Sequence, residues 1–350
     1  MSSVSELDSI GLVLCSDRKG GLENAFVDMA YALVTLGYKV VALTPANAQF
    51  RSMMPELVEF YDYSPKGYWD FFSRFKTRRY IKNNNIKLLV TVNSRATYTI
   101  AKSVSGLNIP VLGVSYSYKH KRMQAADHLV VVTQHMKAHF LQHGWPVGDV
   151  DVLPCMLRNF PVESIALKPV DDVVKLGFVG RLSPEKGLED LVEAMSLLIG
   201  KGRSLSLTIA GSGDDEQKIH ALLAQKGLQQ NVFFSGWITD IREWLKNINL
   251  IIVPSKEETF GIVVLESMAH GCPVVSTYAP GPSSQIENGV TGWLAETGDV
   301  ESLASAIETA LGQSGTWEQV VDNARASACK YSFENQIPII KDIIEKIIVK

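Results

Sequence analysis

The sequence has few cysteines and lacks a long apolar run, and both features narrow the class of protein. Its four cysteines, Cys15, Cys155, Cys272 and Cys329, are far apart and form no C-x-x-C pair. The spacing therefore predicts neither a zinc site nor a disulfide framework, and we expect all four to be small core residues. No apolar run approaches the roughly 18 residues that span a bilayer, and the first residues lack the basic segment of a signal peptide. A cytoplasmic protein is expected.

Basic and acidic residues nearly balance but are unevenly distributed. Residues 1–170 contain 19 Lys and Arg against 13 Asp and Glu, while residues 171–350 contain 15 against 24. The basic first half favours a phosphate-bearing or anionic partner. The acidic overall balance argues against nucleic acid.

The chain of 350 residues is too long for one ordinary core and fits two domains. Short apolar runs alternate with helical patterns in both halves, which predicts parallel α/β sheets. Strands are expected at residues 10–15, 39–44, 87–92, 110–115, 128–133 and 149–154, and then at 173–180, 206–211, 231–236, 249–254 and 273–277.

Two prolines interrupt this pattern between the halves and indicate a linker. We expect an N-terminal Rossmann-like domain over residues 1–160, a linker over 161–172 and a C-terminal Rossmann-like domain over 173–332. In the final stretch, Ile337, Ile340, Ile344, Ile347 and Ile348 have helical spacing, which predicts a packed helix over 333–350. Two doubly wound domains facing each other form a crevice at the carboxyl ends of their strands, so the chemistry is expected in the strand-to-helix loops.

Two cations follow the first strand of the second half, in GFVGRLSPEKG (177–187). A guanidinium at Arg181 and an ammonium at Lys186 suit a diphosphate, because the guanidinium forks onto phosphate oxygens and the ammonium acts as a point charge. Taken alone, two such residues are more often solvated loop charges.

The segment PSKEETFGIVVLESMAHGCPVVS (254–276) supplies the context. Gly261 permits close backbone approach, and the helix expected to begin there offers amide groups to an anion. Glu266, in the first turns of that helix, can accept hydrogen bonds from a ribose diol, and Glu258 would face the hydroxyls of the group that the diphosphate carries. Helix capping and simple exposure are equally good explanations of either carboxylate alone.

The order and spacing of these segments resemble glycosyltransferase family 4, the retaining glycosyltransferases of the GT-B fold. The resemblance runs from Leu176 to Leu311 and rests on GFVGRLSPEKGLEDLVEAM, LTIAGSGDDEQKI, NVFFSGWITDI, the Glu-x7-Glu segment, HGCPVVST and NGVTGWLA. It implies a C-terminal helix that returns to the N-terminal domain.

By this resemblance, Arg181 and Lys186 hold the donor diphosphate, Glu266 the ribose and Glu258 the transferred sugar. Gly236 and Trp237 would approach the base, and Thr259, Phe260 and Gly261 would complete the donor site. Catalytic roles are expected for Glu258, Arg181 and Lys186.

The first half matches the family more loosely, through KGGLENAFVDMAYAL (19–33) and AADHLVVVTQHMKAHFLQHGWP (125–146). Gly20 and Gly21 would let amides approach the donor phosphate or the acceptor, or they form a simple turn. Tyr116 stands where many relatives have a histidine near the sugar, and His120 is a weaker substitute on the acceptor side.

Two further patterns point to other chemistry. Asp149 and Asp151 form an Asp-x-Asp, but they open a strand and are expected to be solvated turn acids, so no metal is expected. Gly211 and Gly213 suggest a dinucleotide fingerprint, but the third glycine is missing and Asp214 would repel a pyrophosphate. A nicotinamide enzyme is not expected.

Residues 60–82 interleave aromatics with five basic residues, Arg74, Lys76, Arg78, Arg79 and Lys82. This segment fits an anionic membrane surface as well as it fits an ordinary helix with core aromatics and solvated charges.

The resemblance implies a metal-independent glycosyltransferase that uses a nucleotide sugar, with UDP as the expected nucleotide. The expected acceptor is a lipopolysaccharide or another cell-surface glycan, reached at the inner face of the cytoplasmic membrane. A non-catalytic sugar-nucleotide or glycan-binding protein of the same fold, and a GT-B sugar-nucleotide epimerase, remain as alternatives. No cofactor is expected, because the nucleotide sugar is a substrate.

Overall fold

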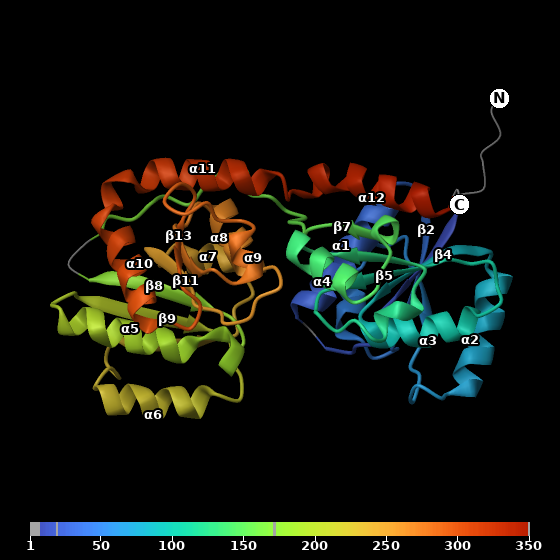
Figure 1. Ribbon diagram of the computed structural model, residues 1–350, viewed down its shortest axis with the longest axis horizontal. Coiled ribbons are helices and arrows are strands. Elements are labelled where there is room, and N and C mark those ends of the chain that lie inside the picture. Colours follow the sequence, from blue (N-terminus) through green and yellow to red (C-terminus); the bar gives the residue numbers. More distant parts are fainter. Residues whose placement is uncertain (1–7, 19, 171–172, 349–350) are drawn as a thin grey trace. The chain divides into compact units, whose positions relative to one another are not determined.

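The chain forms two units, each built on a parallel sheet, in the computed structural model (Figure 1). The structure describes residues 8–18, 20–170 and 173–348. The first unit runs to Arg158 and resumes at Phe333, and the second unit runs from Asn159 to Ser332. The stretch 161–172, expected to be a linker, falls within the second unit, and its residues 171–172 lie outside the described part.

The described strands of the first unit form one sheet in the order β3-β2-β1-β4-β5-β6-β7. These strands are β1 (Ser9–Val13), β2 (Lys39–Thr44), β3 (Glu59–Asp62), β4 (Ile86–Val92), β5 (Val111–Ser115), β6 (His128–Val131) and β7 (Val150–Val152). All neighbouring pairs are parallel, and Ile10 of β1 aligns with Val40 of β2 and Leu88 of β4. The helices are α1 (Gly21–Thr35), α2 (Phe71–Asn83), α3 (Ser94–Val104), α4 (Gln134–Gln142) and α12 (Phe333–Ile348), with short 3₁₀ turns at Gln49–Met53, Met123–Ala125 and Val147–Asp149.

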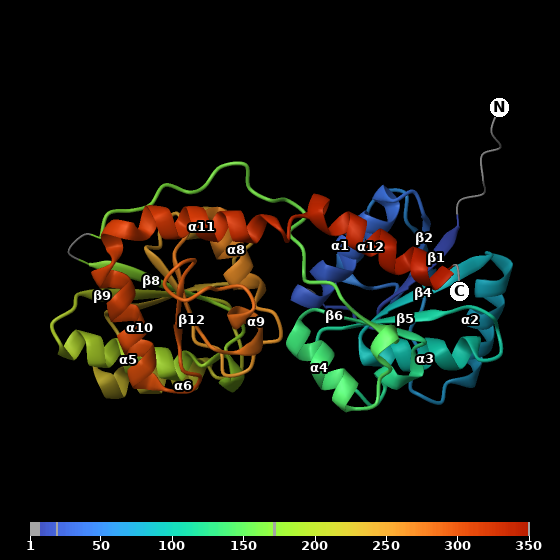
Figure 2. The ribbon, with the colours of Figure 1, turned by 45° about the horizontal axis from the view of Figure 1, so that its top comes forward.

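Successive residues of β1 face two different helical layers. Ile10 and Leu12 are buried in the cluster that contains α1 and α12, whereas Val13 is buried in the cluster that contains α2 and α3. Both faces of the sheet are therefore covered, which explains why the strands are continuous apolar runs. Figure 2 shows α1 and α12 on one side of this sheet and α3 on the other.

Helix α12 belongs to the first unit, as the resemblance implies. Ile340, Ile344 and Ile347 are buried in the core of the first sheet, together with Ile343, which the sequence pattern did not select. Ile337 is only partly buried. Residues 349–350 of the expected helix lie outside the described part.

The described strands of the second unit form a parallel sheet in the order β10-β9-β8-β11-β12-β13. They are β8 (Val174–Val179), β9 (Leu205–Ala210), β10 (Val232–Gly236), β11 (Leu250–Val253), β12 (Val274–Thr277) and β13 (Trp293–Ala295). The helices are α5 (Leu188–Gly200), α6 (Glu216–Lys226), α7 (Ile241–Leu245), α8 (Ile262–His270), α9 (Pro280–Ser283), α10 (Val300–Gly312) and α11 (Trp317–Cys329), with 3₁₀ turns at Pro184–Lys186 and Ser314–Thr316.

The cysteines differ in burial. Cys272 is buried, Cys15 and Cys155 are partly exposed, and Cys329 is exposed. The expectation that all four are core residues is therefore wrong for Cys329. Among the helices of the described residues, none combines the length and the apolar character that crossing a bilayer requires.

Candidate functional site

The candidate cations and carboxylates of the second unit follow its two central strands. β8 lies between β9 and β11, so the connections that leave β8 and β11 diverge to opposite sides. Such a switch point leaves a crevice at the carboxyl edge of a sheet. The loop after β8 carries Arg181 and Lys186, and the loop after β11 carries Glu258 and Gly261. The sheet order therefore brings these two loops together.

Lys186 and Glu258 are in direct contact. The Lys186 Nζ lies 2.5 Å from Oε2 of Glu258, and the two side chains are 26% and 15% exposed. The backbone N–H groups of Lys256 and Glu257 donate to the carbonyl of Glu185 at 2.8 and 3.3 Å, which fixes the two loops to each other. A cation and a carboxylate thus stand side by side at a partly exposed position.

Arg181 lies in the same loop and is exposed to solvent. The Ser183 hydroxyl donates to Oε1 of Glu185 at 2.7 Å. This hydrogen bond lowers the pKa of Glu185, and the positive charges of Arg181 and Lys186 lower it further. Glu185 is therefore ionised at neutral pH, and it was not among the predicted site residues.

Gly187 allows the two loops to pack without an intervening side chain. Its φ is 67°, and a Cβ at this position would lie 2.0 Å from the carbonyl oxygen of Pro254. Both observations require glycine, because an L side chain is strained at positive φ and because the carbonyl already occupies the space. The position of the adjacent Lys186 depends on this contact.

Gly211 and Gly213 support the Arg181 loop from the neighbouring strand connection. A Cβ on Gly211 would lie 1.9 Å from the Gly180 oxygen, and one on Gly213 would lie 2.2 Å from the Leu182 oxygen. The Leu182 N–H donates to the Ser212 carbonyl at 3.0 Å. These glycines therefore serve backbone packing between two loops.

Helix α8 begins at Ile262, and its N-cap residue Gly261 has a φ of 85° and provides no side-chain cap. The start of α8 thus offers backbone N–H groups and the positive end of the helix dipole beside Glu258 and Thr259. Glu266 is partly buried in the second turn of the helix. Phe260 is buried and contacts the ring of Tyr331, with centroids 5.7 Å apart.

Two residues that the sequence did not single out hold this turn in place. The Gln285 side-chain amide donates to the Phe260 carbonyl, and the Gly281 N–H donates to the Glu258 carbonyl at 2.9 Å. A Cβ on Gly281 would lie 2.4 Å from the Phe260 carbonyl. The run Ala-Pro-Gly-Pro signals a turn in the sequence, but only the folded chain shows which backbone it contacts.

Gly236 ends β10 with a φ of 64°, and its carbonyl accepts a hydrogen bond from the Gly211 N–H at 2.8 Å. The next residue, Trp237, is 69% exposed. An aromatic ring of this size in solvent beside the switch-point loops is available to stack on a planar group.

In the first unit, helix α1 begins at Gly21, and its N-cap residue Gly20 again provides no side-chain cap. Glu23 lies in the first turn, is buried and accepts a 2.5 Å hydrogen bond from the Ser16 hydroxyl. A Cβ on Gly20 would lie 3.1 Å from the Glu23 carboxylate. Lys19, which precedes the two glycines, lies outside the described residues.

Tyr116 follows β5 and packs against the core of the first unit. Burial raises the pKa of Tyr116 well above its usual value, and nearby Cys155 and Asp28 add to the effect. Asp28 lies 3.2 Å from Nε of Arg158, whose guanidinium stands 4.1 Å above the ring of Tyr31. Tyr116 thus remains a neutral phenol in a partly buried cluster with an acid and a cation.

Replacing Asp28 by asparagine should change how stability depends on pH. Burial raises the pKa of Asp28 to about 6, against the opposing charge of Arg158. Because the folded pKa lies above the unfolded one, the native protein should lose up to about 3 kcal/mol as pH rises from about 4 to above 6. Asp28→Asn lacks this loss. Urea unfolding at several pH values should show the free energy of unfolding of the variant rising relative to that of the native chain as pH rises. A difference between the two proteins that does not change with pH would contradict the assignment.

His120 lies with His139 and His143, and its ring stacks on that of His143 with centroids 4.0 Å apart. Its expected role on the acceptor side stays a prediction.

Asp151 is not a freely solvated turn acid, contrary to expectation. Its Oδ2 lies 2.8 Å from His128 Nε2 and 2.9 Å from Nζ of Lys346 on α12. Burial opposes the shift, but hydrogen bonds from Lys346 and His128 lower the pKa of Asp151. Asp151 therefore helps to hold α12 on the first sheet, and His128 also lies 3.9 Å from Asp149.

The chain belongs to the glycosyltransferases, and its fold is that of the GT-B enzymes. More particularly, residues 19–157 match the family model described as Glycosyltransferase Family 4, and residues 163–327 match the one described as Glycosyl transferases group 1. The resemblance to this family is confirmed in both halves, and the retaining mechanism stays a prediction.

Similar proteins include enzymes named for bacterial surface glycans. The chain is 36% identical to the lipopolysaccharide core biosynthesis glycosyltransferase LpsE of Rhizobium meliloti, over 43% of each chain. It is 27% identical to the capsular polysaccharide biosynthesis glycosyltransferase CapM of Staphylococcus aureus, over 65% of this chain and 58% of that one. The chain thus spans about half the length of these relatives.

A solved structure, Anabaena HepE in complex with UDP, superposes with a TM-score of 0.82. The sequence identity is 18%, and the match covers 97% of this chain and 100% of that one. This likeness establishes the fold.

Proposed function

We propose that this chain is a retaining glycosyltransferase that moves a sugar from a UDP-linked donor to a hydroxyl of a lipopolysaccharide or other surface-glycan acceptor. Arg181, Lys186 and the amides at Gly261 hold the diphosphate and stabilise the charge that develops on it as it leaves. Glu258 binds hydroxyls of the transferred sugar, and Glu266 binds the ribose.

The contact between Lys186 and Glu258 is the observation that carries this proposal. A nucleotide sugar presents anionic oxygens and hydroxyl groups on adjacent atoms, and the site pairs a cation with a carboxylate 2.5 Å apart at the switch point. The αL start of α8 adds amide donors on the same side as Glu258. In a site for inorganic phosphate alone, the carboxylate would have no hydroxyl to bind.

The remaining donor contacts follow from the same arrangement. Trp237 and Gly236 border the base, and Thr259 and Phe260 shape the turn between sugar and diphosphate. UDP is preferred because HepE, a protein of the same fold, has been solved with it. The surface-glycan acceptor is preferred because LpsE and CapM bear such names.

Calorimetry with UDP, GDP and ADP tests the donor site. UDP should bind most tightly, and Glu266→Ala should weaken it by about 1.5 to 3 kcal/mol through loss of charge-assisted hydrogen bonds to the ribose. Unchanged UDP affinity in the variant would remove Glu266 from the ribose site.

Turnover experiments separate transfer from the alternatives. Release of UDP from a UDP-sugar only when a lipid-linked glycan is present supports transfer. Conversion of the UDP-sugar into its epimer without acceptor, or release of UDP by hydrolysis without acceptor, points to an epimerase, and an unchanged donor under both conditions points to a binding protein. Anomeric proton couplings of the product test retention. Full activity in excess EDTA is expected, because we propose that the transfer step needs no metal.

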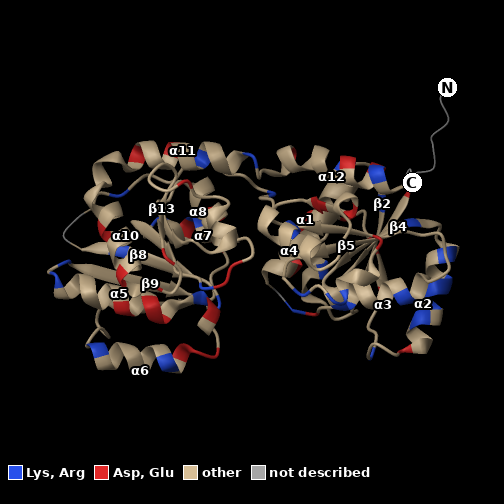
Figure 3. Ribbon diagram, viewed as in Figure 1, with Lys and Arg blue, Asp and Glu red and all other residues tan. Residues whose placement is uncertain are grey.

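Helix α2 is proposed to place the enzyme on an anionic membrane. Thr77 and Ile81 anchor it in the first unit, while its solvent-facing side exposes three phenylalanines, joined by a preceding tryptophan: Trp69 (74%), Phe71 (66%), Phe72 (93%) and Phe75 (72%). Lys76, Arg79 and Lys82 are exposed on the same helix, and Figure 3 shows basic residues gathered on α2. Exposed aromatics beside cations fit the interface of an acidic bilayer.

Vesicle sedimentation tests this surface. The chain should bind phosphatidylcholine vesicles that contain phosphatidylglycerol, and Phe72→Ser combined with Phe75→Ser should weaken binding at least about tenfold, because each buried aromatic contributes about 1.5 to 3 kcal/mol. Phe233→Ser, at an exposed phenylalanine of the second unit, is the matched control and should bind normally. Equal binding by all three proteins would exclude α2 as the membrane contact.

A further inference from the structure

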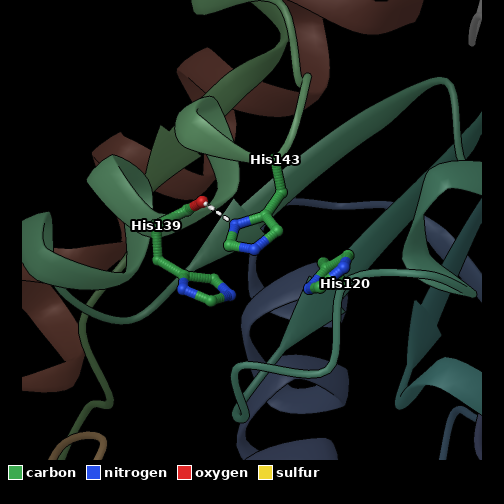
Figure 4. A group of neighbouring side chains, drawn as sticks. All are labelled: His120, His139 and His143. Carbon is green, nitrogen blue, oxygen red and sulfur yellow. Dashed lines mark hydrogen bonds between the residues drawn. The ribbon is translucent and has the colours of Figure 1, made fainter.

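Three histidines from two separate segments of the first unit lie together beside α4 (Figure 4). His139 is in the last turn of α4, His143 caps its end, and His120 lies in the connection between β5 and β6. One ring nitrogen from each lies within 4.8 Å of the others. The spacing of four residues places His139 and His143 on one face of the helix end, where His120 meets them.

The backbone around His120 is held in place. Its carbonyl accepts hydrogen bonds from the N–H groups of Met123 and Gln124 at 2.9 and 3.3 Å, and Met123 is fully buried. The Gln124 side chain donates to the His143 carbonyl at 3.2 Å. The β5–β6 connection is therefore already joined to the end of α4 before any ligand is considered.

Two of the rings are oriented by backbone carbonyls. His143 Nδ1 donates to the His139 carbonyl at 2.8 Å, and His139 Nε2 donates to the Tyr118 carbonyl at 3.0 Å. A carbonyl can only accept, so these nitrogens carry the protons. In the neutral rings this leaves His143 Nε2 and His139 Nδ1 with lone pairs. Figure 4 shows Nε2 of His139 toward His143 and His120, so the His139 ring must turn over and release the Tyr118 carbonyl before Nδ1 can join a shared ion. Histidines that ligate metals commonly donate their other ring N–H to a carbonyl, as His143 does.

Clustered imidazoles would repel one another if protonated. Imidazole nitrogens with free lone pairs suit zinc, nickel or copper, whereas magnesium and calcium require oxygen ligands.

We propose that His120, His139 and His143 bind a divalent transition-metal ion, such as zinc, which bridges the β5–β6 connection and α4. Three imidazoles leave a fourth position for water. Bonds of about 2.0 to 2.1 Å place tetrahedral ligands about 3.3 Å apart, so the rings must close by rotation. His143 is exposed and His120 is half-buried, which leaves them room to turn. The ion holds the loop that begins at Tyr116 and takes no part in the proposed sugar transfer.

Equilibrium dialysis of the untagged chain with zinc chloride tests this site. One equivalent should bind with micromolar or tighter affinity, and His120→Ala and His143→Ala should each weaken it at least tenfold. His135→Ala is the matched control, because His135 belongs to the same helix and bonds the Tyr118 hydroxyl at 2.8 Å but lies outside the trio. It should bind zinc normally.

Two spectroscopic results complete the test. Cobalt should give the intense visible bands of a four-coordinate site in the native chain and in His135→Ala, and not in His143→Ala. Zinc should slow amide exchange in residues 116–124 of the native chain. Millimolar zinc affinity, or binding that survives both His120→Ala and His143→Ala, would overturn the proposal. Neither result bears on UDP binding by the second unit.

Discussion

Gly187→Ala is expected to destabilise the second unit by about 2 to 5 kcal/mol and to abolish measurable UDP binding. Positive φ costs an alanine about 1 to 2 kcal/mol, and forcing a methyl group into a filled site costs about 1 to 3 kcal/mol more. The Cβ would lie 2.0 Å from the Pro254 oxygen. The β8 loop must therefore move away from the β11 loop, and Lys186 moves with it. Urea unfolding followed by tryptophan fluorescence measures the first effect, and calorimetry with UDP measures the second.

Gly227→Ala separates the energetic cost of a positive φ from the cost of a steric clash at Cβ. Gly227 has a φ of 69°, nearly that of Gly187, but nothing lies within 4 Å of the position that its Cβ would take. This variant should lose only about 1 to 2 kcal/mol and should bind UDP normally. If Gly187→Ala and Gly227→Ala lost the same free energy of unfolding, the clash with the Pro254 carbonyl would contribute nothing to the loss.

The elements that sequence patterns predicted are those with long, buried apolar runs. The strands expected at 39–44 and 128–133 correspond to β2 and β6 within two residues. β3 was missed because three of its four residues are exposed at the edge of the sheet, which leaves no apolar run. β13 was missed because it has only three residues.

The candidate site was predictable as far as charge and loop position define it. Arg181, Lys186, Glu258 and Gly261 follow recognisable strands, and sheet order alone brings their loops to one edge. The contacts that hold these loops in place were not predictable. Gln285 contacts Phe260 from 25 residues away, and the space for a side chain at Gly187 depends on a carbonyl far along the chain. Such contacts exist only after the chain has folded.

The histidine trio shows a different limit. His139 and His143 have a spacing of four residues, but the third member depends on where the β5–β6 connection passes. The family resemblance placed His120 on the acceptor side, which stays a prediction, and nothing in the sequence indicated that His120 would meet His139 and His143.

Lys186→Ala and Glu258→Gln are expected to change UDP affinity in opposite directions while both reduce transfer. Lys186→Ala removes a cation from the diphosphate, so UDP binding and turnover should both fall by at least about tenfold to a hundredfold. Glu258→Gln leaves Lys186 without its counter-charge and removes a carboxylate that repels the diphosphate. At an effective dielectric constant between protein and water this repulsion is worth about 1 kcal/mol, so UDP should bind about fivefold more tightly. Transfer should nevertheless fall at least about tenfold to a hundredfold, because the sugar hydroxyls lose an ionised acceptor. Calorimetry with UDP and initial rates with the UDP-sugar measure the two effects.

The opposite signs distinguish a binding pair from a structural ion pair. If the contact between Lys186 and Glu258 only held two loops together, removing either partner would loosen both loops and weaken UDP to a similar degree. Lys226→Ala is the matched control: Lys226 pairs with Glu193 at 2.7 Å, and its 29% exposure is close to the 26% of Lys186. It should leave UDP affinity and turnover unchanged. Parallel losses of UDP affinity in Lys186→Ala and Glu258→Gln would assign the pair to loop stability and would leave Arg181 and the start of α8 as the groups that hold the diphosphate.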